Sequence, residues 1–248
     1  MNWTYYDNYS NHFVMIKNID HANVIHYGSD SLIIKMGTNG PGKPSCLKVL
    51  REEYPSKETI AGLENEFEIC SHAKCSSIRR AFSTQKQEDH AAIVLEYVEG
   101  KDLGKFLATE RITIVQQLQL ATDIISALAD IHKENIFHRR IHLANILIEQ
   151  ATRKVFFIDF GLSTQGNTFE EGMTSSHDNE IEVLKYIAPE QTGRINSSID
   201  KRADLYSMGQ ILYRLFAGEM PLDREEGLEW IYAHVDQKPV APLLHNGV

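Results

Sequence analysis

The chain has 248 residues, of which 42% are hydrophobic and 24% charged, so it contains enough apolar residues for a substantial buried core. Its formal net charge of -9 argues against nucleic acid or an anionic membrane surface as a main partner. Its 3 cysteines are too few for a disulfide framework, and no apolar run approaches the ~20 residues of a membrane span. Because the N-terminal segment also lacks the features of a signal peptide, we expect a folded cytoplasmic protein.

The first part of the chain, after an N-terminal extension at residues 1–22, is predicted to be rich in strands. Short runs of Ile, Val and Leu, separated by turn residues, indicate strands at residues 23–28, 31–37, 45–50, 78–84 and 91–98. The Gly and Pro residues of GTNGPGKP, residues 37–44, predict a hairpin between the second and third strands. Together these runs indicate an antiparallel sheet.

Two helices are predicted from apolar residues that recur at spacings of three and four. The first interrupts the strands and runs from about Ser56 to Cys70. The apolar face of the second is predicted to consist of Ile114, Leu118, Ala121, Ile125 and Leu128. Thr113 and Gln116 predict a capping box at the start of this second helix.

The second half of the chain continues with a strand pair and a further buried helix. NILIE and KVFFID, residues 145–149 and 154–159, are the predicted strands, and a polar segment follows from residue 163 to about 182. The helix is marked by Leu205, Met208, Ile211, Leu212 and Leu215. Gly218 predicts its C-terminal end. A strand-rich part followed by a helical part indicates an α+β protein, in which a ligand commonly binds between two lobes.

Four polar residues stand out against this pattern. Lys48 lies on a predicted strand, on the face opposite its apolar neighbours, and Glu66 on the following helix can form an ion pair with it. Asp159 ends an apolar strand, where a carboxylate needs a partner. With Asn145 it offers the hard oxygen ligands that Mg²⁺ prefers.

A series of motifs in one fixed order resembles the eukaryotic-type Ser/Thr protein kinase domain family. From about residue 24 to residue 242 the series is LKVL, the helix with Glu66, LEYVEGKD, HRRIHLAN, IDFGLS, YIAPE and DLYSMG. The resemblance implies a two-lobed α+β fold, with a small antiparallel β-rich N-lobe at residues 23–98 and a larger helical C-lobe at residues 99–248. The C-lobe is expected to lack the final helices of the family.

The resemblance also implies that ATP and Mg²⁺ are cofactors, and it assigns residues to the phosphates and the metal. Lys48 is expected to contact the α and β phosphates, held in place by Glu66. Asn145 and Asp159 are expected to bind Mg²⁺. Asp204 is expected to brace the backbone of the catalytic loop, HRRIHLAN.

The base and the ribose of ATP have their own positions in this resemblance. Leu95 is similar to the gatekeeper residue, and the backbone from Glu96 to Val98 is similar to the hinge that pairs with adenine. Asp102 falls where kinases bind the ribose, and Leu147 falls where a side chain packs beneath the adenine ring.

Three positions of the catalytic apparatus depart from the family. Arg140 stands where kinases carry the catalytic Asp, and arginine cannot accept a proton. His142 replaces a lysine that steadies the γ-phosphate in the family. Val183 replaces a threonine that forms hydrogen bonds with both the catalytic Asp and that lysine in the family. The phosphate-binding loop is also reduced, because HYGSDSLIIK keeps only Gly28 of three glycines.

Three functions remain open from the sequence. The first is a domain that binds ATP and Mg²⁺ with impaired phosphotransfer and a regulatory or scaffold role, because the changes fall on the acceptor side of the site. The second is an active Ser/Thr protein kinase with an atypical site, because phosphoryl transfer depends mainly on positioning and charge. The third is a partner-binding domain without nucleotide.

A narrower resemblance suggests a partner. LREEYPSKE and APEQTGRINSSIDKRADLYSMG are similar to the kinase-like domains at the N-terminus of large multidomain sensor histidine kinases. The chain is then expected to be a fragment or shortened relative of such a sensor. Its protein partner would be a histidine-kinase or ATPase module, or an unidentified substrate.

Overall fold

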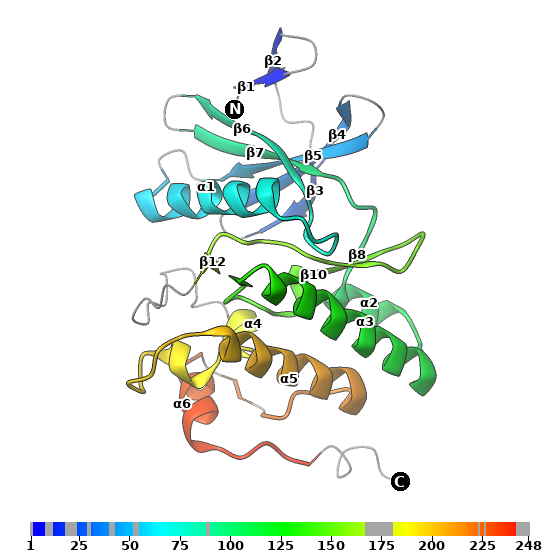
Figure 1. Ribbon diagram of the computed structural model, residues 1–248, viewed down its shortest axis with the longest axis vertical. Helices are drawn as coiled ribbons and strands as arrows, with labels where there is room; N and C mark the ends of the chain where they lie inside the picture. Colours follow the sequence, from blue (N-terminus) through cyan, green and yellow to red (C-terminus); the bar gives the residue numbers. More distant parts are fainter. Residues whose placement is uncertain are drawn as a thin grey trace. The chain divides into compact units, whose positions relative to one another are not determined.

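The computed structural model describes residues 2–7, 12–17, 24–28, 31–39, 43–51, 55–87, 90–166, 181–222, 224–225 and 227–241. The chain divides into two compact units (Figure 1). The smaller unit is Met1–Lys74 with Ile78–Glu99, and the larger is Cys75–Ser77 with Gly100–Val248. The domain ranges expected from the sequence, 1–22, 23–98 and 99–248, stay predictions. Within the residues that the structure describes, no helix is long and apolar enough to cross a membrane.

The smaller unit is built on an antiparallel sheet with the strand order β3-β4-β5-β7-β6 (Figure 1). Its strands are β3 Val24–Tyr27, β4 Ser31–Asn39, β5 Lys43–Leu50, β6 Ala81–Gln87 and β7 His90–Glu96. The predicted strands are therefore confirmed, and β4 and β5 pair as the expected hairpin, although residues 40–42 of its turn lie outside the described residues. A separate antiparallel pair, β1 Asn2–Asp7 and β2 His12–Lys17, lies in the segment expected to be an extension.

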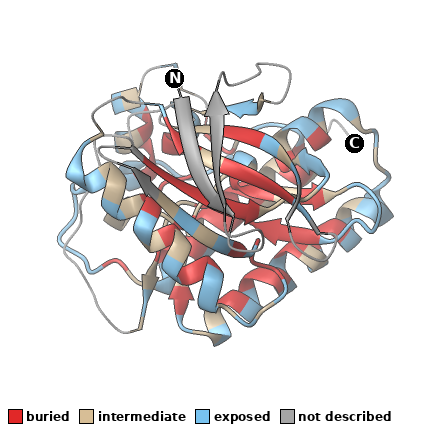
Figure 2. Cartoon of the chain, turned by 90° about the horizontal axis from the view of Figure 1, so that it is seen from above, coloured by how far each residue is buried: buried red, intermediate tan, exposed pale blue. Residues whose placement is uncertain are grey.

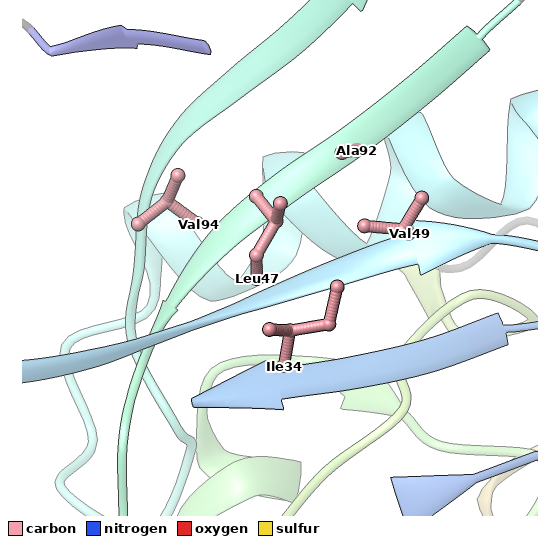
Figure 3. Packing of buried hydrophobic residues seen from close by; sticks show 5 residues of the cluster. All are labelled: Ile34, Leu47, Val49, Ala92 and Val94. Atoms are coloured by element: carbon pink, nitrogen blue, oxygen red, sulfur yellow. The ribbon is translucent and has the colours of Figure 1, made fainter. Parts of the chain in front are cut away.

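The core of this sheet lies on the face opposite Lys48. Ile34, Leu47, Val49, Ala92 and Val94 come from three neighbouring strands and form one buried cluster (Figure 3). Leu47 is aligned with Ile34 on one side and with Val94 on the other. Side chains alternate along a strand, so burying Leu47 and Val49 on this face directs Lys48 to the other.

Helix α1, Lys57–His72, packs against β6 and β7. It begins where predicted, because the Ser56 side chain accepts a hydrogen bond from the Thr59 amide and caps the first turn. Its buried residues are Leu63, Glu66, Ile69 and Cys70. The burial of a glutamate among apolar residues requires a partner, which the site below supplies.

The larger unit is mainly helical. Its main helices are α2 Leu103–Thr109, α3 Ile114–Lys133, α5 Lys201–Ala217 and α6 Gly227–Asp236, with a short α4 at Ile181–Leu184. Two small sheets accompany them, β11 Val155–Phe157 with β10 Ile146–Glu149 and β8 Gly100–Asp102, and β12 Thr164–Gln165 with β9 Ile136–Phe137. Short 3₁₀ helices occur at Leu143–Asn145 and Pro189–Thr192. Buried residues, red in Figure 2, follow the strands and the inner sides of the helices. The predicted α+β class is confirmed.

The predicted apolar face of α3 is partly wrong. Ile114, Leu118 and Ile125 are exposed by 60%, 54% and 46%, whereas the buried face is Leu120, Ala121, Ile124, Ala127, Leu128 and Ile131. Apolar residues extend around a wide arc of this helix, so periodicity alone admits two faces. The face that packs against β9, β11 and α5 is the one that is buried.

Helix α5 ends as predicted. Gly218 adopts a left-handed backbone conformation with φ of 83°, and its amide donates to the Arg214 carbonyl. Of the residues expected on the buried face, Met208, Ile211 and Leu215 are buried, and Leu205 is 53% exposed. A glycine is needed here because other residues rarely adopt a positive φ.

Replacing Thr113 with alanine is expected to lower the free energy of unfolding by about 1 kcal/mol, the typical value of a helix N-cap. Thr113 accepts from the Gln116 amide, and the Gln116 side chain accepts from the Thr113 amide, which is the predicted capping box. Urea denaturation measures the change. Thr122→Ala is the control, because Thr122 lies within the same helix and its hydroxyl donates only to the Leu118 carbonyl. Equal losses in the two variants would contradict the assignment of the cap.

Candidate functional site

The predicted site residues fall in both units, and each group is described within its own unit. In the smaller unit Lys48 Nζ lies 2.5 Å from Glu66 Oε2, so the predicted ion pair is formed. Arg79 Nη2 lies 3.7 Å from the other oxygen, Glu66 Oε1. All three side chains are largely buried, with exposures of 12% for Lys48, 8% for Arg79 and 1% for Glu66. One carboxylate thus holds two cations, and Lys48 is fixed against α1.

Lys48 has buried apolar neighbours on both adjacent strands. Ile33 on β4 and Ile93 on β7 are aligned with Lys48 on either side of β5, and both are buried. Their side chains restrict the lysine stem, while the ammonium group reaches Glu66. An ion pair shielded in this way is screened less by salt than a surface pair.

In the larger unit, Asp204 organises the loop HRRIHLAN. Its carboxylate accepts hydrogen bonds from the backbone amides of His138, at 2.8 Å, and Arg139, at 2.7 Å. His132 Nε2 lies 2.9 Å from the same carboxylate. Asp204 is 1% exposed and stands in the first turn of α5, where a negative charge also interacts favourably with the helix dipole. The expected brace is therefore present.

His138 is a structural residue rather than a replacement base. Its Nε2 lies 2.9 Å from the Ile158 carbonyl and its ring lies 4.6 Å from that of Phe160. The Arg140 amide donates to His138 Nδ1, so the neutral ring uses one nitrogen as a donor and the other as an acceptor. Burial lowers the pKa of His138, which keeps the ring neutral. Neither nitrogen is then available to take a proton from a substrate.

Asn145 and Asp159 are brought together as the sequence predicted. Asn145 Nδ2 donates to the Arg140 carbonyl at 3.0 Å and lies 3.5 Å from Asp159 Oδ2. The Asn145 amide nitrogen therefore lies between the Arg140 carbonyl and the Asp159 carboxylate. Asp159 has a φ of 68°, an uncommon conformation for a residue other than glycine, which is frequent at functional sites. Amide and carboxylate oxygens are ligand types that Mg²⁺ prefers, although the 3.5 Å contact joins the amide nitrogen of Asn145, not its oxygen, to Asp159.

The side chain of Arg140 points toward Asp159. Its Nη1 lies 3.7 Å from Asp159 Oδ2, and its side chain is 14% exposed. The guanidinium group therefore stands beside the acid that is predicted to bind the metal. Residue 140 itself supplies no proton acceptor, because arginine stays charged at every accessible pH.

His142 and Val183 both lie in buried surroundings. Burial, followed by the positive charge of Arg140, lowers the pKa of His142 to about 4. The imidazole is then uncharged at neutral pH, whereas the lysine that it replaces would be a cation. Val183 is 6% exposed on α4, where an unpaired hydroxyl would be unfavourable.

Comparison with known families agrees with this arrangement. A family model described as the protein kinase domain matches residues 19–245. This chain belongs to the protein kinase domain family. Within that family, it is 29% identical over 207 residues to the serine/threonine-protein kinase pkn3 of Myxococcus xanthus, a match that covers 81% of this chain and 38% of that protein. It is 33% identical over 162 residues to the serine/threonine-protein kinase PknB of Mycobacterium tuberculosis, covering 63% of this chain and 25% of PknB.

A further relative is the serine/threonine-protein kinase PrkC of Bacillus subtilis, 29% identical over 193 residues, or 77% of this chain and 29% of PrkC. The kinase domain thus resembles Ser/Thr protein kinases and spans well under half the length of these relatives. The comparisons give no support for a histidine-kinase or ATPase module as partner.

Most of the residues that are predicted to contact the base and the ribose lie on strands of the kinase domain. Leu95 is fully buried on β7, and the Glu96 amide donates to the Arg80 carbonyl at the end of the sheet. In the larger unit Asp102 and Leu147 are aligned on β8 and β10. The Asp102 side chain caps α2 by accepting from the Lys105 amide at 2.8 Å, so this carboxylate already has a structural role.

The reduced glycine loop is only partly described. The Gly28 amide donates to the Ser31 carbonyl, and Arg51 Nη1 donates to the Gly28 carbonyl at 2.8 Å, while residues 29–30 lie outside the described residues. Of Glu96–Val98, the Tyr97 amide donates to the Pro44 carbonyl. The nucleotide-binding roles of Gly28, Glu96 and Val98 stay predictions.

Three contributors to the site were missed from the sequence. Arg79 binds Glu66, His132 reaches Asp204, and Gln191 donates to the Arg139 carbonyl at 2.7 Å. Arg79 left a weak signal, because a charged residue at the edge of an apolar strand segment needs a partner if it is buried. His132 and Gln191 gave none, since each acts across a long sequence separation.

Proposed function

We propose that this kinase domain binds ATP and that its phosphotransfer activity is strongly reduced, so that it acts as a regulatory or scaffold domain. The observation that carries the proposal is the position of Arg140, which stands at the place of the catalytic base with its guanidinium group 3.7 Å from Asp159 Oδ2. General base assistance contributes roughly 10²–10⁴-fold to a reaction, or about 3–5 kcal/mol of barrier. A permanently protonated group supplies none of it.

Support for nucleotide binding comes from residues within each of the two units. Lys48 is held by Glu66 at 2.5 Å, as needed for a lysine that contacts the α and β phosphates. Asn145 and Asp159 are neighbouring side chains, with Asn145 Nδ2 3.5 Å from Asp159 Oδ2. When bound, Mg²⁺ would offset the negative charge of the phosphates. The residues that hold it would be Asn145 and Asp159, while Leu147 and Asp102 would contact the adenine and the ribose.

A second candidate function is an active Ser/Thr protein kinase with an unusual site. It is favoured by the charge of Arg140, because a guanidinium group can stabilise the negative charge that develops on a transferred phosphoryl group. The relatives reported above carry the name serine/threonine-protein kinase, which agrees with this reading. A partner-binding domain without nucleotide is the remaining alternative.

ATP with Mg²⁺ is expected to raise the melting temperature of the purified chain. At 100-fold above Kd, a ligand that binds only the folded state adds ~2.7 kcal/mol to the free energy of unfolding. Differential scanning fluorimetry, with GTP and adenosine as comparison ligands, measures the shift. Lys48→Met is expected to remove the shift in melting temperature. Lys105→Met changes an exposed lysine that is paired with Asp102, and it measures how much the predicted ribose position contributes to that shift.

A phosphate-transfer assay separates the two nucleotide-binding candidates. A thermal shift together with transfer at the level of a no-enzyme control supports the proposed function. Transfer that disappears in Asp159→Asn would favour the active kinase instead. Absence of a shift at millimolar nucleotide, in a chain that melts cooperatively, would favour the partner-binding domain.

A further inference from the structure

The contact between Arg140 and Asp159 has a consequence for the metal. Asp159 Oδ2 is approached by Arg140 Nη1 at 3.7 Å and by Asn145 Nδ2 at 3.5 Å. The Asp159 side chain is 27% exposed and that of Arg140 is 14% exposed. Two nitrogen donors therefore surround the carboxylate oxygen, one of them with a full positive charge. In a partly buried site this charge is poorly screened by solvent and salt.

A divalent cation meets unusual competition at this carboxylate. Mg²⁺ requires oxygen ligands at about 2.0–2.1 Å in octahedral geometry and gives up its water reluctantly. The Arg140 guanidinium group already compensates the charge of Asp159 and repels a second cation brought to the same oxygen. Because arginine remains protonated at all accessible pH values, this compensation is permanent.

The guanidinium group can also compensate the negative charge of the nucleotide phosphates, which is the role of the metal ion in nucleotide binding. Its N–H donors form a planar fork that matches phosphate oxygens, and such charge-assisted hydrogen bonds are strong. The backbone of Arg140 is held by two hydrogen bonds, since its amide donates to His138 Nδ1 and its carbonyl accepts from Asn145 Nδ2, and its guanidinium group lies 3.7 Å from Asp159 Oδ2. The positively charged side chain of Arg140 can thus do two things. It compensates the negative charge of Asp159, and it offers hydrogen-bond donors to the phosphates of a nucleotide.

We propose that Arg140 acts as a built-in counter-cation, so that this domain binds a nucleoside triphosphate with little dependence on Mg²⁺. The proposal rests on the nucleotide binding proposed above and adds a property of the site. It also makes Arg140 a functional residue rather than the remnant of a lost base.

The experiment compares the Kd for ATP in Mg²⁺ and in EDTA by isothermal titration calorimetry. Wild type is expected to show values within about threefold of each other. Arg140→Gln, which removes the charge but keeps a polar side chain, is expected to bind at least about tenfold more weakly in EDTA than in Mg²⁺. Arg140→Lys keeps the charge and should retain binding in EDTA. Arg111→Gln removes one positive charge from an exposed position of the same unit and should behave as wild type.

The outcomes separate this proposal from the one on which it rests. Wild type that binds ATP in Mg²⁺ but loses at least about tenfold in affinity in EDTA overturns the counter-cation and leaves nucleotide binding intact. If wild type and Arg140→Gln both bind ATP equally well in EDTA and in Mg²⁺, with both chains folded by circular dichroism, Arg140 is not the cause of the metal independence. This result also overturns the counter-cation proposal. Absence of binding in both conditions overturns the proposed function and this inference together. A wild type that depends on Mg²⁺ overturns the proposal without any variant, so the proposal can be contradicted even if Arg140→Gln does not fold.

Discussion

Asp204→Ala is expected to lower the free energy of unfolding by about 2–5 kcal/mol, the largest stability loss expected from a single substitution here. The carboxylate accepts from the amides of His138 and Arg139, and His132 Nε2 lies 2.9 Å away. Removing it leaves buried donors without an acceptor, and each such donor costs about 1–3 kcal/mol. Urea denaturation followed by circular dichroism measures the loss.

The same helix provides a matched control for Asp204. Asp200 is the N-cap of α5 and accepts from the Arg202 amide at 2.8 Å. Asp200→Ala removes an aspartate four positions earlier and is expected to cost only about 1 kcal/mol, as N-caps do. If Asp204→Ala costs no more than Asp200→Ala, the brace contributes nothing beyond an ordinary cap, and the loop is held by other contacts.

Much of the smaller unit could be predicted because strand periodicity and burial give the same answer there. Alternation along β5 separates Leu47 and Val49 from Lys48, and the helical spacing of α1 then leaves Glu66 facing the lysine. Arg79 was missed because pairing with Glu66 depends on how the chain enters β6 after α1. Periodicity within one element contains no information on that path.

The buried face of α3 shows a different limit. Ile114 and Ile124 are equally apolar, yet the first is 60% exposed and the second is fully buried. Hydrophobicity ranks residues but does not choose between two apolar stripes on one helix, since the choice depends on which neighbours pack against it.

In the candidate site, too, the sequence predicts the chemistry of a residue but not the direction in which its side chain points. The sequence identified Arg140 as a residue that cannot act as a base, which follows from its chemistry alone. Its approach to Asp159 could not be predicted, because a long side chain has many rotamers and the partner lies on a separate segment. That direction changes the interpretation of Arg140 from the loss of a base to a positive charge placed beside the predicted metal ligand, Asp159.

The combination of Arg140→Asp, His142→Lys and Val183→Thr is expected to raise phosphate transfer by roughly 10²–10⁴-fold, the range of general base catalysis. Asp at residue 140 supplies the proton acceptor. Lys at residue 142 supplies a positive charge, which His142 lacks at neutral pH because its pKa is lowered to about 4 by burial and then by Arg140. Thr at residue 183 gains partners for its hydroxyl. Radiolabelled phosphate transfer to a Ser/Thr peptide pool measures the rate.

The three substitutions are expected to be non-additive, because groups that act as one unit lose function together. Val183→Thr alone should destabilise the chain by about 1–3 kcal/mol, since Val183 is 6% exposed and the new hydroxyl lacks its two partners. Asp159→Asn in the triple variant is the control and should abolish the restored transfer. A triple variant that binds ATP and still transfers no phosphate would locate the defect outside the HRRIHLAN loop. The segment around Gly28, which is predicted to bind phosphate and keeps a single glycine of the family's three, would then be expected to limit the reaction.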